Sequence, residues 1–186
     1  MILMMGPAGA GKSIQGHQLA DEYGYAYIST GEIFRVLITG KRRNDMLTGK
    51  LLSDEEVIRV LDKILDLIDT REQFILDGFP RTKVQVDWLL EQVKSGRFNL
   101  PVVINLEVDQ QVVVDRLKKR ARLDDTEEAI AQRHADYHDL TEPLLQYMKG
   151  KGIDIFDIDA ARDPRAVHMD ISRALGHLFI TNPDHR

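Results

Sequence analysis

The architecture of this chain follows from one segment near its start, Gly6-Pro7-Ala8-Gly9-Ala10-Gly11-Lys12-Ser13. The segment fits the pattern G-x-x-x-x-G-K-[ST], follows an apolar run and opens an amphipathic stretch, which is the context that a phosphate-binding P-loop requires. Its glycines allow successive backbone N–H groups to turn toward a phosphate, the following helix adds partial positive charge, and Lys12 supplies a full charge. The segment therefore predicts a binding site for ATP or GTP.

Apolar segments alternate with longer amphipathic segments along the rest of the chain. Between two of them, Val57, Leu61 and Ile64 recur at helical spacing. Such alternation is typical of parallel strands joined by crossover helices. We therefore expect an α/β fold, a three-layer α/β/α sandwich of the P-loop nucleoside triphosphate hydrolase type with a five-stranded parallel sheet. The expected strands, all buried, span 1–5, 25–28, 74–76, 102–106 and 153–158.

Length and composition narrow the class of protein. The 186 residues suit one domain, since about 150 residues per domain is a loose prior. A net charge of −5 argues against a broad nucleic-acid-binding surface, and no apolar run approaches the roughly 20 residues that span a bilayer. The absence of cysteine excludes a disulfide framework and a Cys-ligated zinc. We expect a single domain over 1–186, located in the cytoplasm, that binds neither nucleic acid nor membranes.

Two further motifs follow the second and third expected strands. They are Ser29-Thr30-Gly31-Glu32-Ile33-Phe34-Arg35 and Asp77-Gly78-Phe79-Pro80-Arg81-Thr82, the latter followed by Gln85. Ligands of open parallel sheets bind beyond the carboxyl ends of strands, where these motifs lie. In order and spacing, the P-loop and these two motifs resemble the adenylate kinase family of P-loop nucleoside monophosphate kinases. The resemblance continues through 115–120, 124–128, Arg133 and 141–144, and so covers nearly the whole chain.

The resemblance implies that the γ-phosphoryl group of Mg-ATP passes to AMP. It assigns ATP binding to Gly9, Ala10, Gly11, Lys12, Ser13, Ile14 and Arg120. It assigns AMP binding to Thr30, Arg35, Lys50, Leu51, Leu52, Gly78, Arg81, Gln85, Arg122 and Arg133, with Thr30 and Gln85 at the base and Arg35 and Arg81 at the phosphate. The planar fork of arginine grips phosphate oxygens through two bonds, which suits both arginines to this role.

Phosphoryl transfer requires positioned positive charge rather than a protein nucleophile, and we expect no covalent intermediate. The residues expected to stabilise the transferring charge are Lys12, Arg81, Arg116, Arg122 and Arg133. In the family's pattern Asp124 and Asp125 resemble the acidic pair that orients the lid arginines. Ser13 and Asp77 are expected to organise Mg²⁺ through its waters, because hard oxygen ligands suit this ion.

The chain departs from the family pattern at both mobile parts that the resemblance implies. The acceptor-binding arm, about 30–60, is short between Arg35 and Gly49, and the lid, about 116–126, has only Ala121 between Arg120 and Arg122. Ile14 stands where the family commonly has Thr. Thr30 favours adenine as the acceptor base. The alternatives are a kinase for UMP, CMP or a small non-nucleotide alcohol, and a nucleotide-binding regulatory module with weak turnover. We expect a monomer.

Overall fold

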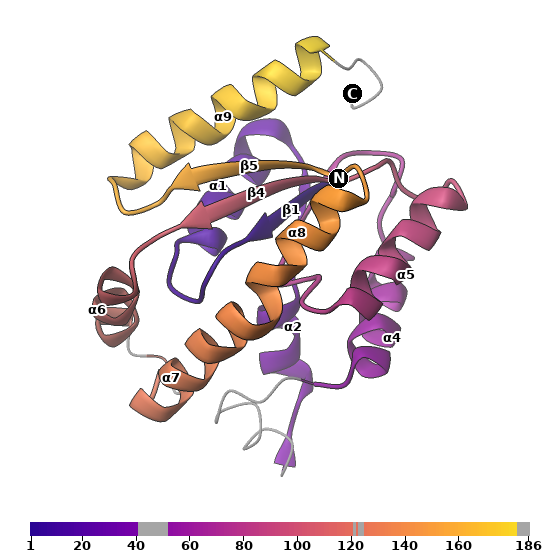
Figure 1. The fold of residues 1–186 in the computed structure, drawn as a ribbon. Helices are drawn as coiled ribbons and strands as arrows, with labels where there is room; N and C mark the ends of the chain where they lie inside the picture. The colour runs from indigo at the N-terminus through magenta and orange to yellow at the C-terminus, as the bar shows by residue number, and fades with distance from the viewer. Residues whose placement is uncertain (41–51, 121, 123–124, 182–186) are drawn as a thin grey trace.

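The computed structural model describes residues 1–40, 52–120, 122 and 125–181. Within these ranges the chain forms a sheet of five parallel strands in the order β2-β3-β1-β4-β5 (Figure 1). The strands are β1 (Ile2–Met5), β2 (Ala26–Ser29), β3 (Phe74–Asp77), β4 (Val102–Glu107) and β5 (Asp154–Asp159). The predicted five-stranded parallel sheet is confirmed.

Helices cover both faces of the sheet. One face carries α1 (Lys12–Tyr23) and α9 (Pro164–Thr181), and the other carries α4 (Asp54–Leu65), α5 (Lys83–Lys94) and α8 (Glu142–Gly150) (Figure 1). The remaining described helices are α2 (Thr30–Leu37), α6 (Gln110–Arg120), α7 (Glu127–Asp136) and the π-helix η1 (Tyr137–Thr141), which joins α7 to α8. The predicted three-layer sandwich is therefore confirmed. No helix in the described ranges is long and apolar enough to cross a membrane.

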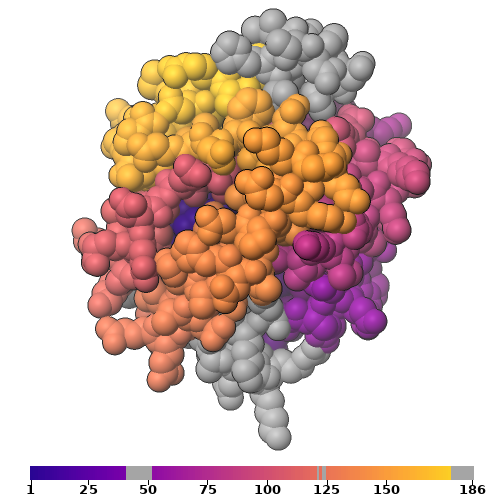
Figure 2. All heavy atoms as spheres, in the orientation of Figure 1, coloured from indigo at the N-terminus to yellow at the C-terminus, as the bar shows by residue number. Residues whose placement is uncertain are grey.

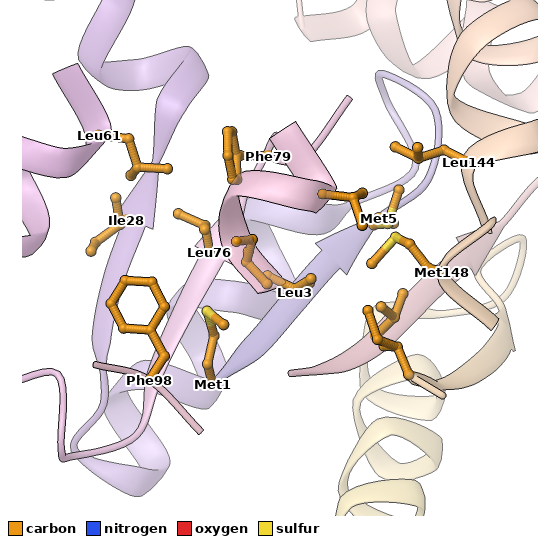
Figure 3. Packing of buried hydrophobic residues seen from close by; sticks show 14 of the residues in the cluster. Met1, Leu3, Met5, Ile28, Leu61, Leu76, Phe79, Phe98, Leu144 and Met148 are labelled. Carbon is orange, nitrogen blue, oxygen red and sulfur yellow. The ribbon is translucent and has the colours of Figure 1, made fainter. Parts of the chain in front are cut away.

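The central strand β1 divides the core into two halves, because successive residues of a strand point to opposite faces. Leu3 and Met5 enter the half covered by α4, α5 and α8, where the buried neighbours include Leu61, Leu76, Phe79, Leu144 and Met148 (Figure 3). Ile2 and Met4 enter the half below α1 and α9, with Leu19, Ile75, Ile104, Ile171 and Leu175. Both halves are apolar, as expected for a parallel sheet covered on its two faces.

The prediction that all strands are buried was wrong for β5. Asp154, Asp157 and Asp159 of this strand are exposed, and of its six residues only Ile158 is buried. β5 pairs with β4 alone and so forms an edge of the sheet. An edge strand can alternate apolar and charged residues, and charged residues there discourage pairing with another chain. The apolar pattern of 153–158 predicted the strand but not its position at the edge.

The register of the sheet brings the sequence motifs to one end. Ser29, the last residue of β2, lies opposite Asp77, the last residue of β3, and Asp77 lies opposite Met4 of β1. Because all strands are parallel, the P-loop and the two motifs after β2 and β3 leave the sheet at the same end, where the strands have their carboxyl ends. The candidate site forms at this end.

We expect Gly6→Ala to lower the free energy of unfolding by at least about 2 kcal/mol, since left-handed strain alone costs about 1–3 kcal/mol. Gly6 has a φ of 128°, and a Cβ there would lie 2.5 Å from the backbone oxygen of Leu106. Urea unfolding would measure the loss. Gly96→Ala is the matched control, because Gly96 has a φ of 79° but a Cβ there would meet nothing within 4 Å. An equal loss in both variants would contradict the assigned role of the Leu106 contact.

Candidate active site

A cavity of about 920 Å³ lies beyond the carboxyl ends of β1, β2 and β3. In the space-filling view, indigo atoms of the N-terminal part of the chain are visible at the bottom of a hollow between pink and orange segments (Figure 2). All predicted nucleotide-binding, catalytic and metal-binding residues that the structure describes line this cavity: Gly9, Ala10, Gly11, Lys12, Ser13, Ile14, Thr30, Arg35, Leu52, Asp77, Gly78, Arg81, Gln85, Arg116, Arg120, Arg122 and Arg133. Lys50, Leu51, Ala121 and Asp124 lie outside the described residues.

The P-loop folds Lys12 back onto its own backbone. The Lys12 Nζ donates to the backbone oxygens of Gly6 and Pro7, both at 2.8 Å. The pKa of Lys12 is lowered to about 8, chiefly by burial; Asp77 opposes the shift, and the nearby charges of Arg81, Arg120 and Arg133 add to it. A negatively charged ligand in the cavity would favour the protonated amine of Lys12, so the P-loop is suited to bind an anion.

Asp77 is the buried carboxylate of the site and is 4% exposed. Its Oδ2 accepts hydrogen bonds from the hydroxyls of Tyr27 at 2.8 Å, Ser13 at 3.2 Å and Ser29 at 3.5 Å. Burial and the charge of Asp77 raise the pKa of Tyr27, because both oppose a phenolate at this position. Ser13 and Asp77 therefore offer hard oxygen ligands side by side at the start of α1, which fits Mg²⁺.

Gly78 allows the strand β3 to pass close to the start of α2. Gly78 has a φ of 81°, and a Cβ there would lie 2.7 Å from the Thr30 Oγ1. Without a Cβ at this position, the Thr30 hydroxyl can lie against β3 and donates to the backbone oxygen of Asp77 at 3.2 Å. Both residues line the cavity, so a ligand can approach the backbone at this point.

Arg81 places its guanidinium at the cavity, with no carboxylate partner among the described residues. Its Nε donates to the backbone oxygen of Gly78 at 3.0 Å, and within the described part of the chain no carboxylate lies at ion-pair distance from its guanidinium. Burial lowers the pKa of Arg81, and the charges of Arg133 and Arg35 act in the same direction. An unpaired, desolvated guanidinium gains most from an anion that completes its hydrogen bonds.

Arginines between α6 and α7 converge on Asp125. The Arg120 guanidinium donates to both carboxylate oxygens of Asp125, at 2.6 and 2.8 Å, and the Arg133 guanidinium donates at 3.3 Å. From Arg122 only the backbone N–H donates to Asp125, at 3.0 Å. Burial opposes ionisation of Asp125, but these hydrogen bonds and positive charges prevail and lower its pKa. Arg116 lies apart from this group and donates to the backbone oxygens of Ala10 at 3.5 Å and Ala161 at 3.4 Å.

Sequence reasoning missed several residues that line or support the cavity. Tyr27 supports Asp77, and its place two residues before Ser29 on one strand face was the signal that could have revealed it. Asp54 accepts hydrogen bonds from both Thr82 and Gln85, although no motif marks it beyond an acidic first turn of α4. Asp136 and Tyr137 line the cavity at the start of η1, and a π-turn of this kind frequently marks a functional site.

Comparisons with known proteins agree with this geometry. A family model described as adenylate kinase matches residues 4–153. The chain is 34% identical to an adenylate kinase of Nitrobacter hamburgensis, over 94% of this chain and 91% of the relative. It is 38% identical to an adenylate kinase of Corynebacterium urealyticum, over 86% of this chain and 90% of the relative. It is 31% identical to an adenylate kinase of Archaeoglobus fulgidus, over 94% of this chain and 97% of the relative. The chain belongs to the adenylate kinase family.

Proposed function

We propose that this protein transfers the γ-phosphoryl group of Mg-ATP to AMP and so forms two molecules of ADP. The observation that carries the proposal is the convergence of the P-loop and the motifs after β2 and β3 on one cavity lined by Lys12 and seven arginines. Membership of the adenylate kinase family makes the chain a phosphotransferase, and its relatives from bacteria and an archaeon bear the name adenylate kinase.

The donor would bind at the P-loop. Backbone N–H groups of Gly9 to Ser13 would surround the phosphates, and Lys12 would turn from its backbone partners to the phosphate oxygens. Arg116, which lies between the P-loop and Ala161, would border the donor nucleoside. Ile14 is 60% exposed and would lie against the donor rather than in the core.

The acceptor would bind on the side of the cavity formed by α2, α4 and the start of α5. Thr30, Leu52 and Gln85 would surround the base, while Arg35 and Arg81 would hold the phosphate and aim it at the donor. Arg120 and Arg133, paired with Asp125, and Arg122 would approach from the side of α6 and α7. The protein supplies geometry and positive charge, and no side chain needs to form a bond to phosphorus.

Ser13 and Asp77 would hold Mg²⁺, directly or through water, since both present oxygen atoms next to the P-loop. When bound, the ion neutralises charge on the phosphate oxygens. Tyr27 and Ser29 would keep Asp77 in position through their hydrogen bonds to its Oδ2. The cytoplasmic location, the monomeric state and the lack of nucleic-acid binding remain predictions.

We expect AMP to be the preferred acceptor among AMP, GMP, CMP, UMP and dTMP. Each would be supplied with Mg-ATP in an assay coupled to ADP formation, with a reaction lacking acceptor as the control. The reason is the pairing of Thr30 and Gln85 beside the two phosphate-binding arginines. Preference for UMP or CMP would replace AMP with a pyrimidine acceptor. Bound ATP without acceptor-dependent turnover would point to a regulatory module.

We expect Arg81→Ala to lower kcat by roughly 10³-fold or more, while ATP alone still binds, because a positioned cation acts on the transferring charge. Steady-state kinetics would measure turnover, and titration calorimetry would measure ATP binding. Arg59→Ala is the matched control, since Arg59 is exposed on α4 and does not line the cavity. Near-normal turnover of Arg81→Ala would refute the assigned role.

ATP affinity should fall as pH rises above the Lys12 pKa of about 8, because bound phosphates favour the protonated amine. Between pH 8 and 9.5 we expect a loss of roughly tenfold per pH unit at the upper end, accompanied by proton uptake on binding. Calorimetry in buffers of different ionisation enthalpy would measure both quantities. Lys12→Met, measured at higher nucleotide concentration, should bind more weakly and lose this pH dependence. Constant wild-type affinity across the range would contradict the expectation.

A further inference from the structure

The side-chain amide of Gln85 is fixed by two protein partners of opposite kind. Its Oε1 accepts from the backbone N–H of Arg81 at 2.7 Å, and its Nε2 donates to the Asp54 Oδ1 at 2.8 Å. Gln85 is 3% exposed and still lines the cavity. A glutamine amide has two N–H donors and two acceptor lone pairs, so one donor and one acceptor remain for a ligand.

These partners allow only one orientation of the amide. The backbone N–H of Arg81 can only donate, and an ionised carboxylate can only accept. Rotation of the Gln85 amide by 180° would set its NH₂ against the Arg81 N–H and its oxygen against the Asp54 carboxylate. Both hydrogen bonds would be lost, and two repulsive contacts would replace them. Neither partner can exchange donor and acceptor roles, and Asp54 supplies the charge-assisted one of the two hydrogen bonds that fix the orientation.

Asp54 is itself held in place. It is the first residue of α4, and its Oδ1 also accepts from the Thr82 hydroxyl at 2.8 Å. The Thr82 Oγ1 in turn caps α5 by accepting from the backbone N–H of Gln85 at 3.3 Å. The network thus joins the first turns of α4 and α5, and it fixes both the backbone and the side chain of Gln85.

The orientation of this amide determines which base edge it can pair with. A donor beside an acceptor matches adenine, which has a ring-nitrogen acceptor next to a 6-amino donor. A 6-oxo purine presents the reverse order, a ring N–H beside a carbonyl oxygen, and would match only the rotated amide. A glutamine free to rotate would accept both kinds of base. A site with fixed polarity rejects the mismatched base because buried polar groups would be left unpaired.

We propose that Asp54 is a positioning residue that determines acceptor specificity: by fixing the Gln85 amide it selects a 6-amino purine over a 6-oxo purine. This inference rests on the proposed function, since it requires that Gln85 faces the acceptor base. Asp54 acts through Gln85 and has no part in the transfer itself. Its removal should therefore change the choice of acceptor without changing the binding of ATP.

The test compares AMP with inosine monophosphate, because the two differ at position 6 and in the protonation of the neighbouring ring nitrogen. We expect the ratio of their kcat/KM values, AMP over inosine monophosphate, to fall by about tenfold or more in Asp54→Ala, as loss of one charge-assisted hydrogen bond would cause. In Asp54→Asn, whose amide can turn either way, we expect a smaller fall of about threefold or more. The KM for ATP should stay at the wild-type value in both variants.

Glu55→Ala and Glu55→Gln are the matched controls. These substitutions remove one negative charge from the first turn of α4, as the Asp54 substitutions do, but Glu55 is exposed and does not line the cavity. Both controls should keep the wild-type ratio. Equal losses of kcat/KM with the two acceptors in the Asp54 variants would overturn the inference, and Asp54→Asn decides the matter if Asp54→Ala does not fold. A wild-type protein without AMP turnover would instead refute the proposed function.

Discussion

The buried carboxylate of Asp77 is the contact on which the rest of the site depends. It ends β3 and accepts hydroxyl hydrogen bonds from the start of α1 and from two residues of β2. Its own backbone oxygen accepts from Thr30 at the start of α2. One residue therefore positions α1, which follows the P-loop, the strand β2 and the helix α2 relative to one another. A buried carboxylate is stable only with such partners, so the constraint acts in both directions.

The cavity concentrates positive charge that the protein only partly neutralises. Asp77 opposes the deprotonation of Lys12 and Arg81, and Asp125 gathers Arg120 and Arg133. Burial is the main cause that lowers the pKa values of Lys12 and Arg81, and repulsion from the neighbouring arginines adds to it. Two bound nucleotides would relieve this repulsion, because their phosphates bring the missing negative charge into the same low-dielectric space.

On the acceptor side, the hydrogen bonds between two helices also determine how a side chain in the cavity is oriented. α4 and α5 cover the same face of the sheet, and their first turns share the hydrogen bonds of Asp54, Thr82 and Gln85. The hydrogen bonds that join the first turns of these two helices also fix the orientation of an amide in the cavity. Such a link requires no motion, and it arises because an ionised carboxylate can accept hydrogen bonds but cannot donate them.

The sequence by itself determined the features that local patterns encode. The P-loop at 6–13, the positions of all strands and the parallel α/β class follow from short-range apolar periodicity and glycine placement, and the structure confirms the strands and the class. The motifs at Thr30 and Arg81 were visible because each directly follows a strand. Since the carboxyl ends of parallel strands share one edge of the sheet, these residues could be expected to meet.

Only the tertiary structure decided which strand forms an edge and which side chains support the site. The aspartates of β5 are exposed on a strand that pairs on one side alone. The apolar residues of a segment indicate a strand, but they do not reveal the order of the strands in the sheet. Tyr27 reaches Asp77 across 50 positions, and Asp54 reaches Gln85 across 31. Hydrogen bonds of this kind depend on the directions of two side chains from separate elements. A linear sequence specifies residue types and local geometry, whereas those directions are set only when the sheet and its helices have packed.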